Sequence, residues 1–102
     1  MRMEVSNRLT MLKGSVTARC DARSDRNCAW VCVYPRSDGQ FDVSTVEIDQ
    51  RYLEADDDVG EDDIIRSDLG IFGSIAQVNE AVKLVGVDPD DLAAPWRNDY
   101  PL

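Results

Sequence analysis

Residues 28–34 constrain the fold of this chain most strongly, because all seven of them, Cys-Ala-Trp-Val-Cys-Val-Tyr, are apolar or aromatic. Successive side chains of a strand point to opposite faces of its sheet, so this segment presents an apolar surface on both faces. We expect a central strand that is covered on both sides, by a helix on one face and by a loop or a partner on the other.

Three neighbouring segments complete the predicted sheet. Residues 15–20 alternate between apolar and polar side chains, which is the period of a half-buried strand. Residues 8–12 precede them across Lys13-Gly14, a two-residue connection in which glycine would supply the positive φ of a tight hairpin. Residues 41–48 follow the turn-forming sequence Pro-Arg-Ser-Asp-Gly and resume the strand pattern.

The strand predicted at residues 41–48 contains an irregularity. Its first apolar residues, Phe41 and Val43, have one parity, whereas the aliphatic residues that follow have the other. We expect a bulge near Ser44 and Thr45, since one inserted residue would bring both pairs to the same face of the sheet.

The second half of the chain contains an amphipathic helix at residues 74–85. Ser74 is a favourable N-cap, Gln77 completes a capping box, and Gly86 follows the last turn. Four aliphatic residues recur at helical spacing, which predicts that this face packs across the sheet on residues 28–34. They are Ile75, Val78, Val82 and Val85.

Shorter elements surround this helix. We expect a brief helix at residues 62–69 that ends at Gly70, and a last turn with Asp88 as its cap and Pro89 in its first position. Residues 95–102 are interrupted by prolines, which predicts a tail without regular structure.

Together these elements predict an α+β fold. A chain of 102 residues has the length of a single domain. The simplest arrangement is a four-stranded antiparallel meander with one main C-terminal helix packed on it. We expect the sheet within residues 8–48, an acidic loop at 54–63, the helix at 74–85 and the irregular tail at 95–102.

The sequence has three cysteines and no histidine. An odd number of cysteines is not a disulfide framework, and the lack of histidine excludes Ser-His-Asp or Cys-His catalysis and histidine-containing zinc sites. Cys28 and Cys32 lie four residues apart on one strand, roughly 13 Å, which is too far for a disulfide. Cys20 would lie opposite Cys28 if their strands pair around residues 21–27. We expect reduced thiols that pack in the sheet.

Charge is distributed unevenly along the chain. Residues 1–36 carry seven bases and three acids, whereas residues 37–102 carry four bases and seventeen acids, and the net charge is −9. The densest stretch, residues 54–63, has seven carboxylates and no base. Such a field repels nucleic acid and anionic membranes and attracts basic proteins.

The acidic stretch could be a calcium loop, a solvated loop or a binding surface. Asp56-x-Asp58-x-Gly60 superficially resembles the start of an EF-hand loop, but its glycine comes one position early and Ser67 stands where the bidentate glutamate is required. Clustering favours a binding surface, because the acids repel one another and a basic partner would relieve that repulsion. A loop that only aids solubility is the alternative.

Catalysis and nucleic-acid binding have less support. Paired acids such as Asp56 and Asp58 lie in a strongly polar context, which predicts exposure rather than a catalytic pair. Trp30 and Tyr34 lie among arginines, a combination also found on single-stranded nucleic-acid platforms. Their spacing places them on the same strand face as two cysteines, so we expect them in the core.

The aromatic tail has two interpretations. Trp96 and Tyr100 could pack on the domain as a strap, or they could anchor a partner, since Trp and Tyr are enriched in binding hot spots. We include both among the candidate partner-binding residues.

No stretch of about 18 apolar residues occurs, and the first residues lack the apolar core of a signal peptide. We therefore expect no transmembrane helix and a cytoplasmic location.

These features predict a non-enzymatic acidic inhibitor without cofactor or metal. It would bind a basic, nucleic-acid-handling toxin or nuclease and occlude its phosphate-binding cleft. Bacterial immunity proteins are similar in kind, although no motif is shared. The alternatives are a phage-type nucleic-acid mimic that inhibits a defence nuclease, and a carboxylate-based metal-dependent enzyme. The predicted partner-binding residues are Glu54, Asp56, Asp57, Asp58, Glu61, Asp62, Asp63, Trp96 and Tyr100.

Overall fold

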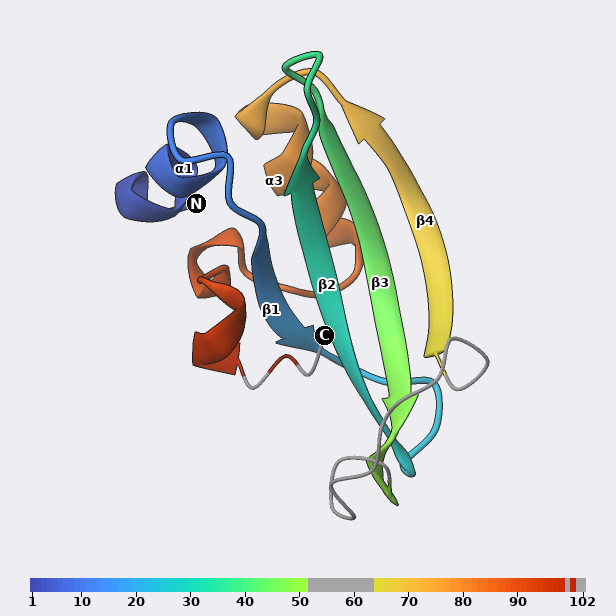
Figure 1. The fold of residues 1–102 in the computed structure, drawn as a ribbon. Coiled ribbons are helices and arrows are strands. Elements are labelled where there is room, and N and C mark those ends of the chain that lie inside the picture. The colour runs from blue at the N-terminus through green and yellow to red at the C-terminus, as the bar shows by residue number, and fades with distance from the viewer. Residues whose placement is uncertain (52–63, 99, 101–102) are drawn as a thin grey trace.

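The computed structural model of the chain describes residues 1–51, 64–98 and 100. Its strands form one antiparallel sheet in the order β1-β2-β3-β4, and α3 lies across one face of that sheet (Figure 1). The α+β fold and the four-stranded meander are therefore confirmed. The elements are α1 (Met3–Thr10), β1 (Val16–Cys20), β2 (Asn27–Pro35), β3 (Phe41–Asp49), β4 (Ile64–Phe72), α3 (Ile75–Leu84) and the 3-10 helices η2 (Pro89–Asp91) and η3 (Pro95–Asn98).

The prediction of a strand at residues 8–12 is wrong, because most of this segment belongs to α1 or to the turn that follows it. Val5 and Leu9 lie four residues apart and are both buried, so α1 has one apolar face that packs on the domain. The connection to β1 is a helix-to-strand loop in which Lys13, at φ 56°, adopts the left-handed conformation expected of the following glycine.

The prediction of a brief helix at residues 62–69 is also wrong, since residues 64–72 form β4. Its three isoleucines favour a strand, and pairing with β3 completes the sheet. Gly70, which was expected to end the helix, lies inside the strand at φ +138°, where an added Cβ would come within 3.1 Å of the Phe72 ring. Glycine is therefore required at this position.

A bulge interrupts the pairing of β3 with β4 near the predicted position. Val43 pairs with Gly70, whereas its neighbour Ser44 pairs with Asp68. The extra residue is therefore Leu69 of β4, and β3 itself continues without an insertion.

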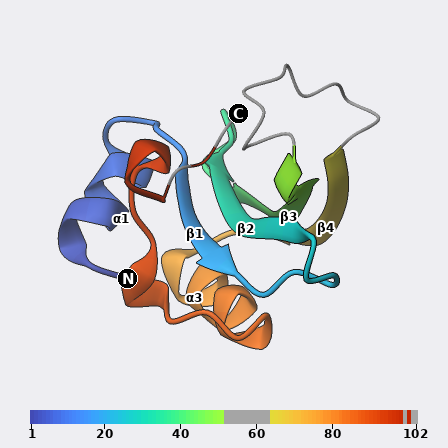
Figure 2. The ribbon, with the colours of Figure 1, turned by 90° about the horizontal axis from the view of Figure 1, so that it is seen from below.

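The sheet separates two apolar cores, which explains the two parities of β3. Phe41 and Val43 contribute to the larger core, together with α1 and α3, while Val46 and Ile48 contribute to the smaller core on the opposite face. Figure 2 shows α3 against the first of these faces. The strand at residues 28–34 is buried on both sides, as its sequence requires. The smaller core consists of Trp30, Cys32, Val46 and Ile48, with Cys28, Tyr34, Ile64 and Tyr100 packed against it.

The caps of α3 are as predicted in outline. The Gln77 backbone N–H donates to Ser74 Oγ at 3.2 Å, and Gln77 Oε1 accepts from the Gly73 N–H at 2.9 Å, one residue earlier than in a capping box. The helix ends before Gly86, which adopts φ +81°. The predicted aliphatic face packs in the larger core, which also contains Val31 and Val33 of β2, while the sheet strands nearest to α3 are β3 and β4.

Asp88 caps η2 as expected, because its Oδ1 accepts from the Asp90 N–H at 2.9 Å. Pro95 begins a second 3-10 helix, η3, so the tail predicted as irregular contains one short regular element. Prolines prevent a longer helix but are compatible with such a first turn.

The three cysteines are free, as predicted. Cys20 pairs with Ala29 rather than with Cys28, so the expected register is wrong by one residue. That single step places Cys20 against the larger core and Cys28 against the smaller one, on opposite faces of the sheet.

Candidate protein-binding site

The seven acidic residues of the predicted site lie outside the described residues, so their binding role stays a prediction. They are Glu54, Asp56, Asp57, Asp58, Glu61, Asp62 and Asp63.

Tyr100 packs on the domain, as the strap interpretation expects. Its ring meets Trp30 edge to face, with ring centroids 5.7 Å apart, and its hydroxyl lies 3.1 Å from the Tyr34 hydroxyl. Burial, followed by hydrogen bonding to Cys32 and Tyr34, raises the pKa of the Tyr100 phenol. Its ring and hydroxyl are thus committed to the smaller core.

Trp96 is placed differently, although only a few residues away. It is 68% exposed, and the Arg8 guanidinium lies 4.7 Å from its ring centroid. Its indole is therefore open to a partner, and its binding role stays a prediction.

The two outer strands of the sheet differ in a way that bears on function. The outer edge of β1 is covered, because Thr17 and Ala93 exchange hydrogen bonds of 2.8 and 2.9 Å and Asn98 Nδ2 donates to Thr17 O at 2.7 Å. In the part of the chain that the structure describes, no strand pairs with the outer edge of β4. Such an edge can accept an added strand.

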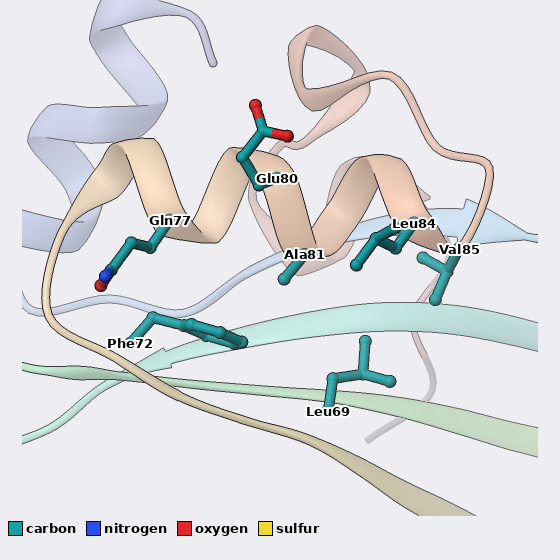
Figure 3. Close-up of a pocket in the computed structure, with 7 residues that line it drawn as sticks. All are labelled: Leu69, Phe72, Gln77, Glu80, Ala81, Leu84 and Val85. Carbon is teal, nitrogen blue, oxygen red and sulfur yellow. The ribbon is translucent and has the colours of Figure 1, made fainter.

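An apolar groove of about 310 Å³ lies between β4 and α3, beside this open edge. Figure 3 shows Leu69 and Phe72 of the strand on one side and Ala81 and Val85 of the helix side facing them. Leu84 extends the groove and is 88% exposed. Gln77 and Glu80 complete its lining.

A polar pocket of about 230 Å³ continues this groove past the C-terminal end of α3. Leu69 and Val85 line both cavities, so the two are neighbours. The remaining walls come from β1 to β4 and the β1–β2 loop. They are Cys20, Asp21, Arg23, Ala29, Thr45, Glu47, Ile65 and Ser67.

Glu47 is the unusual residue of this pocket, because it is a carboxylate that is only 5% exposed. Its Oε1 accepts from the Arg23 backbone N–H at 2.6 Å. The Arg23 guanidinium turns instead to Ser67, whose Oγ accepts from Nη2 at 3.3 Å. These two bonds hold the β1–β2 loop over β3 and β4, and among the described residues no cation forms an ion pair with Glu47.

The Cys20 thiol lines the same pocket and is partly buried. Burial is the main reason that its pKa is raised to about 11; Cys32, Asp21 and Glu47 add smaller effects in the same direction, while Arg19 opposes them. The thiol is therefore protonated at neutral pH and is a poor nucleophile.

Within residues 1–51, 64–98 and 100, no cluster of three or more Cys, Asp or Glu side chains is arranged to hold a metal ion. The helices of that part of the chain are too short or too polar to span a membrane. Comparisons with protein-family models, curated proteins and solved structures find no match to the chain.

Sequence reasoning missed both cavities because the wall formed by β4 was predicted to be a helix. Leu84 gave one signal, since it is a large apolar residue that lies off the predicted aliphatic face of its helix. Glu47 gave no sequence signal of the pocket, because a single acid between the aliphatic residues of a strand is expected to point to solvent.

Proposed function

We propose that this protein is a non-enzymatic inhibitor that binds an extended, basic segment of another protein along β4. The observation that carries the proposal is the outer edge of β4, which no strand of the described residues pairs with and which lies beside an apolar groove, while the opposite edge of the sheet is closed by Ala93. An added strand would gain main-chain hydrogen bonds from the edge, and the groove would take one of its apolar side chains.

Charge supports a basic occupant. The chain has a net charge of −9, and the seven acids of residues 54–63 directly precede β4 in the sequence. Glu80 adds an exposed carboxylate to the lining of the groove. The negative charge of the chain accelerates its association with a basic protein and suppresses its own binding to nucleic acid.

A basic protein that handles nucleic acid is the partner class that fits this charge. We infer a toxin or nuclease that is neutralised in the cytoplasm when its phosphate-binding cleft is covered. Carboxylates suit this role because they accept the same Arg and Lys donors that would otherwise bind phosphate.

Affinity capture with matched variants tests the proposal. The bait is the full chain, either unchanged, with Leu84→Asp at the groove, or with Leu12→Asp as the control. Leu12 is 74% exposed and lies beyond α1, away from the groove. The unchanged and Leu12→Asp baits should retain the same basic protein, which the Leu84→Asp bait should lose.

The captured protein is then produced alone and assayed on nucleic acid. We expect the unchanged chain and Leu12→Asp to inhibit it and Leu84→Asp to inhibit it poorly. Equal inhibition by all three would show that the groove is not the binding site. Binding without inhibition would show that the protein is not an inhibitor.

A further inference from the structure

The polar pocket suggests how the bound segment is recognised, an inference that rests on the proposed function. We propose that this pocket receives a lysine or arginine side chain of the segment along β4, and that Glu47 is the residue that selects it. The groove between β4 and α3 would take an apolar side chain of the same segment.

Glu47 carries the inference because it is a carboxylate that is only 5% exposed and, among the described residues, forms no ion pair. A buried carboxylate is costly unless it is paired and hydrogen-bonded. A carboxylate can accept about four hydrogen bonds, and in the described part of the chain Glu47 accepts one, from the Arg23 N–H. Glu47 lines the polar pocket, so a cationic side chain in that pocket would be placed to pair with its carboxylate.

The surroundings of Glu47 favour a cation further. Asp21 adds a second carboxylate to the lining, and Val85 marks the C-terminal end of α3, where the helix dipole is negative. The hydroxyls of Thr45 and Ser67 offer acceptors.

The neighbouring basic residues that the structure describes contact other side chains and do not pair with Glu47. Arg23 bonds to Ser67 at the pocket wall, and Lys83 pairs with Glu80 at 3.6 Å on the exposed side of α3. Within the described residues, neither one forms an ion pair with Glu47.

The two cavities also define a spacing. Leu69 and Val85 line both, so an extended segment that fills one can reach the other. Side chains of a strand that point to the same face are separated by an even number of positions. We therefore expect an apolar residue and a base separated by an even number of positions in the bound segment.

Selection from a random peptide library tests this without knowledge of the natural partner. Peptides displayed on phage are selected on the full chain and on Glu47→Gln, which retains an oxygen for the Arg23 N–H. A selected peptide is then synthesised in two forms, one with its lysine or arginine and one with norleucine at that position. The replacement should weaken binding to the unchanged chain about tenfold and should hardly affect binding to Glu47→Gln.

Ser67→Lys is the second variant, because it would place an ammonium group of the chain itself in the pocket. It should abolish the preference for a base while the preference for the apolar residue remains. Urea unfolding of both variants checks that they are folded. If Glu47→Gln is not folded, the peptide preference of Ser67→Lys tests the role of the pocket.

The outcomes separate the two proposals. Peptides that share an apolar residue without a base would overturn the role of the pocket and leave the groove in place. A preference for a base that survives both variants would overturn the role of Glu47. A library that yields no binding peptide would contradict both the pocket and the proposed function.

Discussion

The Tyr100 ring packs edge to face on Trp30, with centroids 5.7 Å apart and planes inclined by 70°, on the side of the sheet opposite α3. The Trp30 indole N–H donates to Asn98 O at 2.8 Å, so two residues of the C-terminal segment hold one buried indole. This segment completes the smaller core, and its loss should affect stability.

We predict that Tyr100→Ala lowers the free energy of unfolding by about 2 kcal/mol or more, because it removes an aromatic ring from the smaller core. Tyr100→Phe should lower it by about 1 kcal/mol, since it keeps the ring and loses only the hydroxyl contacts with Tyr34 and Cys32. Urea unfolding measures both. Trp96→Ala is the matched control and should have a small effect, because Trp96 is largely exposed. Similar losses in the free energy of unfolding for Trp96→Ala and Tyr100→Ala would show that Tyr100 does not pack on the domain as a strap.

The larger core gives a second prediction. Val82 is fully buried on α3, so Val82→Asp should destabilise the fold by more than about 4 kcal/mol through an unpaired buried charge. Glu80→Ala on the exposed side removes only the surface pair with Lys83 and should change stability by less than about 0.5 kcal/mol. Near-equal urea midpoints for the two variants would show that the aliphatic face of α3 is not in the core.

Alkaline pH should destabilise the protein. Burial raises the pKa of Cys20 from 9.0 to about 11 and raises those of Cys32, Tyr34 and Tyr100 as well. The folded chain keeps protons that the unfolded chain releases, so the free energy of unfolding falls as the pH rises from 9 to 11. Urea unfolding across this range measures the slope. Cys20→Ala removes one of these groups and should give a shallower slope, and a stability independent of pH would contradict the burial of these groups.

The sequence predicts three of the four strands with nearly correct bounds, but not the fourth. The all-apolar segment at residues 28–34 identified the central strand, and Ser74 with its aliphatic face identified α3, because both patterns follow directly from burial. Residues 8–12 and 62–69 were assigned wrongly because short segments fit either period, and tertiary packing decides between them.

The candidate site was less accessible to sequence reasoning. Within the residues that the structure describes, the edge of β4 is open because β4 is the last strand of the sheet. The pocket at Glu47 requires residues from four strands and a loop to meet. Charge patterning predicts a basic partner but not the surface that holds it.

The acids of residues 54–63 should control the rate of association with the isolated partner. Replacing Asp57, Asp58, Asp62 and Asp63 by Asn or Ser should slow association and flatten its dependence on salt, while urea unfolding stays unchanged. Stopped-flow measurements at low and high salt give the rates. An unchanged on-rate at low salt would exclude these acids from the encounter.

Hydrogen exchange of the chain with and without its isolated partner is the most direct test of the binding surface. We predict that binding slows exchange at residues 64–72 and 77–85, which form β4 and the groove side of α3, and leaves α1 and η3 nearly unchanged. Protection confined to residues 3–10 and 95–98, with none along β4, would contradict it.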